Sequence, residues 1–294
     1  MDRSDASIPS GDSELAAWVY RPPADVASGA CVVMGHGFSL TRHDGLSPIA
    51  EAFAAAGATV VCFDYRFFGD SGGQPRQRFR ASAQQEDWRN AIAFARSLDG
   101  VNPDKIVAWG YSFGGGHAVN VAAGDSRLAA LILLYPFLDG PGRVKATRLG
   151  LVASLVPRAL ADFAGMSVTV PVTGPPGSRG AMSLPGESAG FASVVGPESP
   201  WRNEITPGVF ATLIAHRPWT KAASLRMPIW VGLGERDITV PAAGIRRLVE
   251  RAPNAQLHRY DTDHFEVFAE PHLGRLIADQ IEFLRQCGLI GVEV

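Results

Sequence analysis

The sequence IVAWGYSFGGG at residues 106–116 carries the strongest structural signal in this chain of 294 residues. Its first part is an apolar run typical of a buried strand, and a helix-compatible segment begins near Phe113. Between them stands a G-x-S-x-G motif centred on Ser112. A strand that turns sharply into a helix strains its junction residue and leaves little room for neighbouring Cβ atoms, which favours glycine there. The pattern predicts that Ser112 is an exposed nucleophile.

The same turn is expected to stabilise negative charge beside the serine. The first N–H groups of a helix lack intrahelical partners and carry partial positive charge, so the Phe113 N–H is a candidate oxyanion donor. A second donor is needed from a nearby loop. The sequence MGHGF at residues 34–38 follows another apolar run and offers the Phe38 N–H, while its glycines permit close approach to a substrate. We expect His36 to orient this loop through hydrogen bonds, with an ordinary turn residue as the alternative.

A serine hydroxyl needs a positioned base to take its proton, and seven histidines compete for that role. His264 is favoured because it directly follows the last strand candidate, where a loop shares the sheet edge of the nucleophile turn. His117 follows Ser112 by five positions on the same helix and therefore points to a different face. Surface or core positions are expected for His43, His216, His258 and His272.

The base in turn needs an acid that fixes its tautomer. Asp237 is our candidate because it lies in the loop after the penultimate strand and reaches the base from the same edge. Asp261 and Asp263 precede the histidine too closely to reach its far nitrogen, and Glu235 is expected to cap or to pair with Arg236. The predicted chain order of nucleophile, acid and base is the one that follows a G-x-S-x-G elbow.

Short apolar runs alternate with helical patterns through most of the chain, which predicts an α/β fold with a mostly parallel sheet covered on both faces. The first run alternates more than the others and ends at a proline pair, which favours an edge strand. The strand candidates are residues 15–20, 30–35, 58–64, 105–110, 129–135, 228–232 and 256–260. The helix candidates are residues 47–56, 81–98, 113–123, 242–250 and 273–285.

This alternation stops between residues 137 and 220, which we interpret as an inserted cap or lid, with a disordered insertion as the alternative. Residues 144–163 suit an amphipathic helix that Pro157 would kink or divide. Residues 165–208 contain several Gly-Pro and Pro-Gly pairs and are expected to be irregular. The hydrolytic core would then comprise residues 1–136 and 221–294.

Composition excludes several classes of protein. A total of 27 Lys and Arg against 29 Asp and Glu gives a net charge of −2, so no nucleic-acid or membrane partner is expected. The N-terminus lacks a signal-peptide pattern, and no apolar run approaches the ~20 residues that span a bilayer. We therefore expect a soluble, cytoplasmic protein. No phosphate-binding loop, zinc-binding helix motif or Cys/His metal spacing occurs, so neither a cofactor nor a metal is expected.

Two further features are expected to be structural. The sequence GDSGG at residues 69–73 copies the nucleophile motif of chymotrypsin-like proteases. Those enzymes depend on an all-β double barrel, which this chain does not offer, so Asp70 and Ser71 are read as turn-forming and capping residues. Cys31, Cys62 and Cys287 are expected to be reduced packing residues.

Taken together, these motifs resemble the α/β-hydrolase family, and within it the dienelactone-hydrolase-like and feruloyl-esterase-like branch. The resemblance implies acyl transfer in which Ser112 attacks a carbonyl, His264 accepts the proton, Asp237 supports the base, and the N–H groups of Phe38 and Phe113 hold the oxyanion. Dienelactone hydrolases use a cysteine nucleophile, so the serine in this chain points to ester chemistry. The substrate would be a small apolar ester, lactone or thioester.

Alternatives remain open at this point. The same residues would serve an acyl or polyketide transferase or a short-peptide hydrolase, whereas a non-catalytic binding module would need none of them. The oligomeric state is also open, a homodimer included. Apolar residues of the inserted segment would either line an acyl pocket or pack among themselves, namely Leu151, Leu155, Phe163, Met166 and Phe210.

Overall fold

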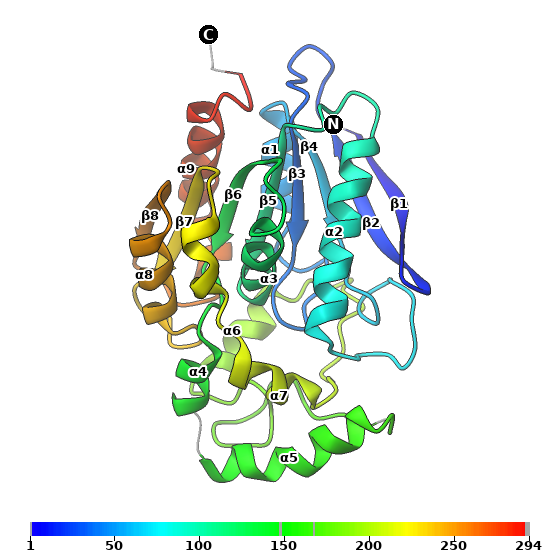
Figure 1. Cartoon of the computed structure of the whole chain (residues 1–294), viewed down its shortest axis with the longest axis vertical. Helices are drawn as coiled ribbons and strands as arrows, with labels where there is room; N and C mark the ends of the chain where they lie inside the picture. The colour runs from blue at the N-terminus through cyan, green and yellow to red at the C-terminus, as the bar shows by residue number, and fades with distance from the viewer. Residues whose placement is uncertain (1, 147–148, 167, 292–294) are drawn as a thin grey trace.

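One eight-stranded sheet runs through the described part of the computed structural model, which comprises residues 2–146, 149–166 and 168–291 (Figure 1). Within it, the side chains of residues 146 and 149–155 are not described. The strand order is β1-β2-β4-β3-β5-β6-β7-β8, and the pairs from β4 onward are all parallel. The strands are β1 (Asp2–Ser10), β2 (Ser13–Arg21), β3 (Cys31–Gly35), β4 (Thr59–Phe63), β5 (Ile106–Tyr111), β6 (Leu128–Leu134), β7 (Ile229–Gly234) and β8 (Ala255–Tyr260).

The predicted α/β fold is confirmed, because helices cover both faces of this sheet (Figure 1). Strands β3, β4 and β5 are buried along their whole length, which explains why they read as continuous apolar runs. All five predicted helices are present. They are α1 (Ser47–Ala55) and α9 (His272–Gln286) on one face, and α2 (Ala81–Ser97), α3 (Phe113–Ala122) and α8 (Ala242–Arg251) on the other.

The first strand, β1, was missed by the sequence analysis. It pairs antiparallel with β2, so the prediction of an edge strand at residues 15–20 is wrong and β1 takes the edge. Most side chains of β1 are exposed, so its sequence lacks the apolar pattern of a buried strand. Its signal was the two-residue Gly11-Asp12 turn between the paired Ser10 and Ser13, in which Gly11 adopts a φ of +60°.

Most of the described part of residues 137–217 lies beyond the carboxyl ends of the parallel strands, at the lower end of Figure 1. They form α4 (Gly140–Ala146), α5 (Leu149–Phe163), α6 (Glu187–Val194) and α7 (Gly208–Ala215). Helix α5 runs through Pro157, so the expected division at that residue is wrong.

The stretch from 165 to 208 was expected to be irregular, and this is wrong for part of it. Besides helix α6, two isolated bridges join Val170 to Ile205 and Thr173 to Met182. Asn203 adds a side-chain bond, because its Oδ1 accepts from the Thr173 N–H at 2.8 Å. Helix α6, the two bridges and this bond give residues 168–208 a defined backbone fold.

Two histidines that lie near the nucleophile turn are core residues. His117 is fully buried, and its Nε2 lies 2.8 Å from Gln84 Oε1. His216 donates from Nε2 to the Phe137 carbonyl at 2.9 Å, and its ring stacks on the Phe137 ring with centroids 5.3 Å apart. Desolvation lowers the pKa of His216 to about 4 and lowers that of His117 as well.

We therefore expect the free energy of unfolding to fall as pH falls from about 6.5 towards 4. Between these pH values His216 is protonated in the unfolded chain but neutral in the folded chain, because its pKa is lower in the folded state. Protonation at this residue therefore lowers the free energy of unfolding by up to about 3 kcal/mol. Urea denaturation at a series of pH values measures the effect. A His216→Gln variant should show a shallower fall, and the partly exposed His272→Gln variant should not. Identical profiles for His216→Gln and the parent protein would contradict the assignment.

Candidate active site

Ser112 sits at the junction between β5 and α3, in a strained backbone conformation with φ +53° and ψ −118°. A serine keeps such a conformation only where the surrounding structure fixes the backbone of the turn. A Cβ atom on Gly110 would lie 2.6 Å from the Gly114 carbonyl oxygen, and a Cβ atom on Gly114 would collide with the His36 carbonyl oxygen. The glycines of the motif are thus required by neighbouring backbone.

The structure brings Ser112, His264 and Asp237 together at the carboxyl edge of the sheet. His264 Nε2 lies 2.9 Å from Ser112 Oγ, and His264 Nδ1 lies 2.6 Å from Asp237 Oδ2. The other carboxylate oxygen, Asp237 Oδ1, accepts from the backbone N–H groups of Thr239 and Val240 at 2.8 and 2.9 Å. One oxygen therefore fixes the loop after β7, and the other orients the imidazole.

The rival acids have other partners. Asp261 pairs with Arg236 at 2.9 Å, and Asp263 Oδ1 accepts from backbone N–H groups two and three residues further on. Glu235 pairs with Arg259 at 2.6 Å, so the expected pair between Glu235 and Arg236 is wrong. Arg236 instead lies over the next loop, where Asp261 accepts its Nε–H.

Sequence reasoning missed Tyr111, which positions the imidazole. Its ring stacks on that of His264 with centroids 5.0 Å apart and an interplanar angle of 26°. Its hydroxyl donates to the His264 carbonyl at 2.9 Å. Because burial raises the pKa of Tyr111 well above its usual value, the hydroxyl remains a donor. In the sequence, Tyr111 is marked only by its position directly before the nucleophile. The G-x-S-x-G motif allows any residue at that position, so it does not predict a tyrosine.

The loop at residues 36–38 packs directly on the nucleophile turn. A Cβ atom on Gly37 would lie 3.3 Å from Ser112 Cβ, so the backbone on either side of it passes close to the serine. The His36 Nδ1 atom lies 2.9 Å from the Gly37 carbonyl oxygen, and desolvation lowers the pKa of this histidine. Among the described residues nothing accepts the Phe38 N–H, and the Phe113 N–H is the first of a helix.

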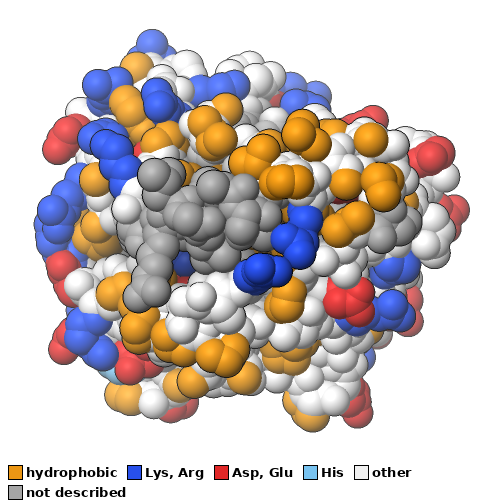
Figure 2. Space-filling model, turned by 90° about the horizontal axis from the view of Figure 1, so that it is seen from below, with side chains coloured by type: hydrophobic (Ala, Val, Ile, Leu, Met, Phe, Trp, Pro, Cys, Tyr) orange, Lys and Arg blue, Asp and Glu red, His pale blue; other side chains and the backbone are white. Residues whose placement is uncertain are grey.

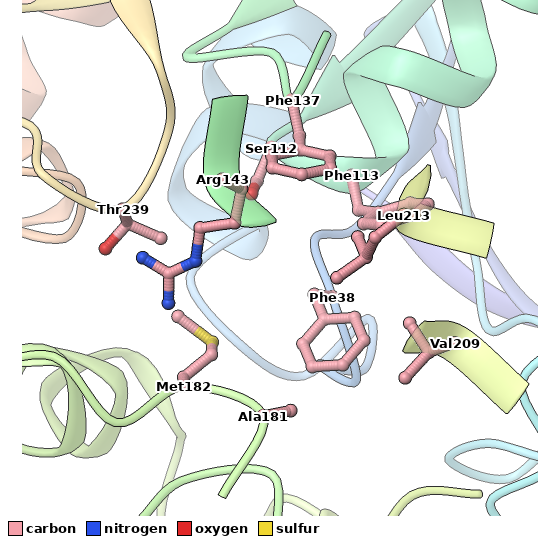
Figure 3. Close-up of a pocket in the computed structure, with 10 residues that line it drawn as sticks. All are labelled: Phe38, Ser112, Phe113, Phe137, Arg143, Ala181, Met182, Val209, Leu213 and Thr239. Carbon is pink, nitrogen blue, oxygen red and sulfur yellow. The ribbon is translucent and has the colours of Figure 1, made fainter. Parts of the chain in front are cut away.

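A pocket opens over the serine, and side chains from the core and from residues 137–220 share its walls (Figure 3). It is lined by Phe38, Ser112, Phe113, Phe137, Arg143, Ala181, Met182, Val209, Leu213 and Thr239. These walls leave Ser112 only 7% exposed, so the expectation of an exposed nucleophile is wrong. The serine faces this pocket and not the outer surface of the molecule.

Three of the acyl-pocket residues suggested by the sequence, Phe163, Met166 and Phe210, do not line this pocket. Phe163 and Met166 are 54% and 60% exposed, and Figure 2 shows hydrophobic side chains spread over this end of the molecule. Phe210 packs against the core instead. The side chains of Leu151 and Leu155 lie outside the described residues. Helix α5 lies at the end of the segment that is farthest from the sheet (Figure 1).

The GDSGG sequence is part of a turn, as predicted. Ser71 is buried; its Oγ donates to the Asp64 carbonyl at 2.7 Å and accepts from the Ala16 N–H at 2.8 Å. Asp70 pairs with Arg42 at 3.0 Å. The hydroxyl of this serine thus both donates and accepts, and the two bonds tie the turn to the neighbouring strands.

Within the described ranges, no group of three or more His, Cys, Asp or Glu side chains has the arrangement of a metal site. Over the same ranges, every helix is too short or too polar to cross a bilayer.

Comparisons with known proteins agree with this architecture. A family model for the α/β-hydrolase fold matches residues 31–271. Quorum-quenching protein AidA of Acinetobacter baumannii is 36% identical over 287 residues, which cover 96% of this chain and 94% of AidA. Thiohydrolase aneE of Aspergillus aculeatus is 30% identical over 184 residues, 62% of this chain and 58% of aneE. The crystal structure of the α/β hydrolase GrgF from Penicillium superposes with a TM-score of 0.81 at 23% identity, covering 97% and 99% of the two chains. The chain belongs to the α/β-hydrolase fold family.

Proposed function

We propose that this protein is a serine hydrolase that cleaves carboxylic esters through an acyl-enzyme on Ser112. The observation that carries the proposal is the unbroken series of hydrogen bonds from Asp237 through His264 to Ser112, with contacts of 2.6 and 2.9 Å. A serine hydroxyl is a weak nucleophile until such a base accepts its proton. A binding module would have no use for this arrangement in a buried, strained turn.

In the first half of the reaction, Ser112 Oγ attacks the ester carbonyl while its proton moves to His264 Nε2. Asp237 accepts the Nδ1–H bond and stabilises the imidazolium that forms. The carbonyl oxygen becomes an oxyanion, for which the Phe38 and Phe113 N–H groups are the proposed donors. The C–O bond of the ester then breaks, His264 returns the proton to the leaving alcohol, and the acyl group stays on the serine.

In the second half, water replaces the alcohol. A second cavity lies against His264, and its lining includes the polar residues Glu187, Arg236, Thr239 and Asp263. We propose that the alcohol leaves and water arrives on this side, where Nε2 accepts a proton from water as it attacks the acyl-enzyme. Collapse of the intermediate releases the acid and restores the serine hydroxyl.

The segment from 137 to 220 is proposed to act as a cap that shapes the acyl pocket. Six of its residues line the pocket above Ser112, and five of these have apolar side chains, namely Phe137, Ala181, Met182, Val209 and Leu213. Burial of an acyl chain against them is favourable at about 25 cal/mol per Å² of apolar surface. An apolar acyl group is therefore the expected occupant.

A panel of p-nitrophenyl esters of graded acyl length, with matched thioesters and anilides, tests the proposed function. We expect ester turnover with an optimum chain length set by the pocket, and at least about 100-fold slower turnover of anilides, whose leaving group is poorer. Thioesters belong in the panel because one relative is named a thiohydrolase. Acyl transfer to an added alcohol or amine without hydrolysis would replace the proposal by a transferase. The absence of any acyl-enzyme would contradict both.

A further inference from the structure

The mostly apolar pocket over Ser112 is lined by Arg143, which belongs to a buried ion pair. Arg143 projects from α4, and Glu187 is the first residue of α6. The two residues are 7% and 1% exposed, and Arg143 Nη2 lies 2.9 Å from both carboxylate oxygens. In Figure 3 the Arg143 side chain extends into the pocket, with its guanidinium group between Thr239 and Met182. An ion-paired guanidinium group therefore faces the space beside Ser112.

The position of this guanidinium group is fixed by its partner. Glu187 also accepts from the Thr239 hydroxyl at 3.0 Å and from the Leu184 N–H at 2.8 Å. Its place in the first turn of a helix is favourable for a carboxylate. Thr239 belongs to the same loop as Asp237, whose Oδ1 accepts the Thr239 N–H. The guanidinium group is thus held in a defined place relative to the proposed catalytic acid.

Stability does not account for an ion pair at this place. A buried pair loses so much hydration that well-packed apolar residues of equal volume are often as good or better. Arginine offers five N–H donors in a rigid fork, which makes it a residue suited to recognising oxygen atoms. In a pocket lined by Phe38, Phe137 and Met182, it supplies a site for an oxygen on an apolar chain.

We infer that Arg143 selects acyl groups that carry an uncharged oxygen acceptor, a ketone or a hydroxyl, along an otherwise apolar chain. This inference rests on the proposed function. An uncharged acceptor is favoured over a carboxylate because Glu187 already balances the arginine charge. A carboxylate on the substrate would lie near the carboxylate of Glu187 and would be repelled by it. It would also lose its hydration without gaining a positive charge that is not already paired.

The test compares p-nitrophenyl octanoate with its oxo analogues, in which a ketone is moved along the chain one carbon at a time. A charge-assisted hydrogen bond in a buried site should raise kcat/KM for the best analogue by roughly tenfold to a hundredfold over octanoate. The mono-p-nitrophenyl ester of a dicarboxylic acid of equal length provides the charged comparison, and we expect it to be poorer than octanoate. Preference for this charged ester over every ketone would overturn the assignment of an uncharged acceptor.

Variants then assign the preference to the arginine. A double variant, Arg143→Met with Glu187→Met, removes both charges and leaves no buried ion unpaired. Its ratio of kcat/KM for the best oxo ester over octanoate should fall to about 1. Lys145→Met, an exposed cation on the same helix, is the matched control and should keep the parent ratio. Because each variant is compared with itself on two substrates, an overall loss of activity does not obscure the result.

The possible failures are distinguishable. Turnover of octanoate without preference for any oxo analogue would overturn this inference and leave the proposed esterase intact, and this outcome needs only the parent protein. Retention of the preference in the double variant would overturn the role of Arg143. Failure of every ester, together with an unlabelled Ser112 in a fluorophosphonate reaction, would overturn the proposed function and this inference with it.

Discussion

A Ser112→Ala variant is expected to lose ester hydrolysis by a factor of about 10⁵ to 10⁶ in kcat and to lose all labelling by a fluorophosphonate probe. The reason is that no other hydroxyl in the described structure is in contact with His264 Nε2. What remains after removal of the nucleophile is the contribution of the oxyanion donors and of substrate binding. Stopped assays with the best p-nitrophenyl ester, and gel detection of the labelled chain, measure the two losses.

Ser71→Ala is the matched control because Ser71 stands in the competing GDSGG sequence. Its hydroxyl is occupied by the Asp64 carbonyl and the Ala16 N–H, so we expect this variant to keep both labelling and turnover. It should lose about 1–3 kcal/mol of stability through the unpaired backbone groups. Labelling that persists in Ser112→Ala and disappears in Ser71→Ala would move the nucleophile to the other motif.

Asp237→Asn is expected to lower kcat by about 10⁴. The amide should keep its Oδ1 bonds from Thr239 and Val240, so the loop is expected to hold its shape. The loss arises at the imidazole. An NH₂ group opposite His264 Nδ1 favours the tautomer that puts the proton on Nε2, where it cannot accept one from the serine. Turnover of the best ester across a range of pH measures this effect.

Asp261→Asn supplies the comparison for that variant. Asp261 is an exposed residue in the loop that carries His264, and it pairs with Arg236. Exposed pairs contribute little, so we expect less than a twofold change in kcat. Equal losses in the two variants would show that the loops respond to any change of charge, and a loss below tenfold in Asp237→Asn would remove Asp237 from the proposed mechanism.

Much of the fold was predictable because its elements are specified locally. Strands β3, β4, β5 and β7 are buried along their whole length, and their apolar sequences show it. The turn at Ser112 needs glycines where other backbone approaches, and this requirement is visible without knowledge of the partners. Placing Asp237 and His264 required only that loops after parallel strands meet at one edge. Strand β1 was not predicted because an exposed edge strand is stabilised mainly by backbone hydrogen bonds. These bonds require no particular pattern of apolar and polar side chains.

The pocket was much less predictable. Arg143 and Glu187 are separated by 44 positions, and either residue alone resembles a surface charge in a polar stretch. Their contact depends on how α4 and α6 are placed relative to each other. The spacing of apolar residues along the sequence does not predict that placement. The apolar pattern of α5 was informative about a helix but not about which side of it would meet a neighbour. Phe163 and Met166 are consequently exposed, while Met182, in an unpatterned stretch, reaches the pocket.

The hydrogen bond from the Thr239 hydroxyl to Glu187 limits how freely this architecture can be recombined. A chimera that received residues 137–220 from another enzyme would lose the acceptor of that hydroxyl, on the very loop that presents Asp237. Exchange of the segment would then disturb turnover as well as selectivity, unless the donor sequence brings a carboxylate to the same place. We expect chimeras whose inserted segment keeps Glu187 and Arg143 to retain the position of the Asp237 loop and therefore their turnover.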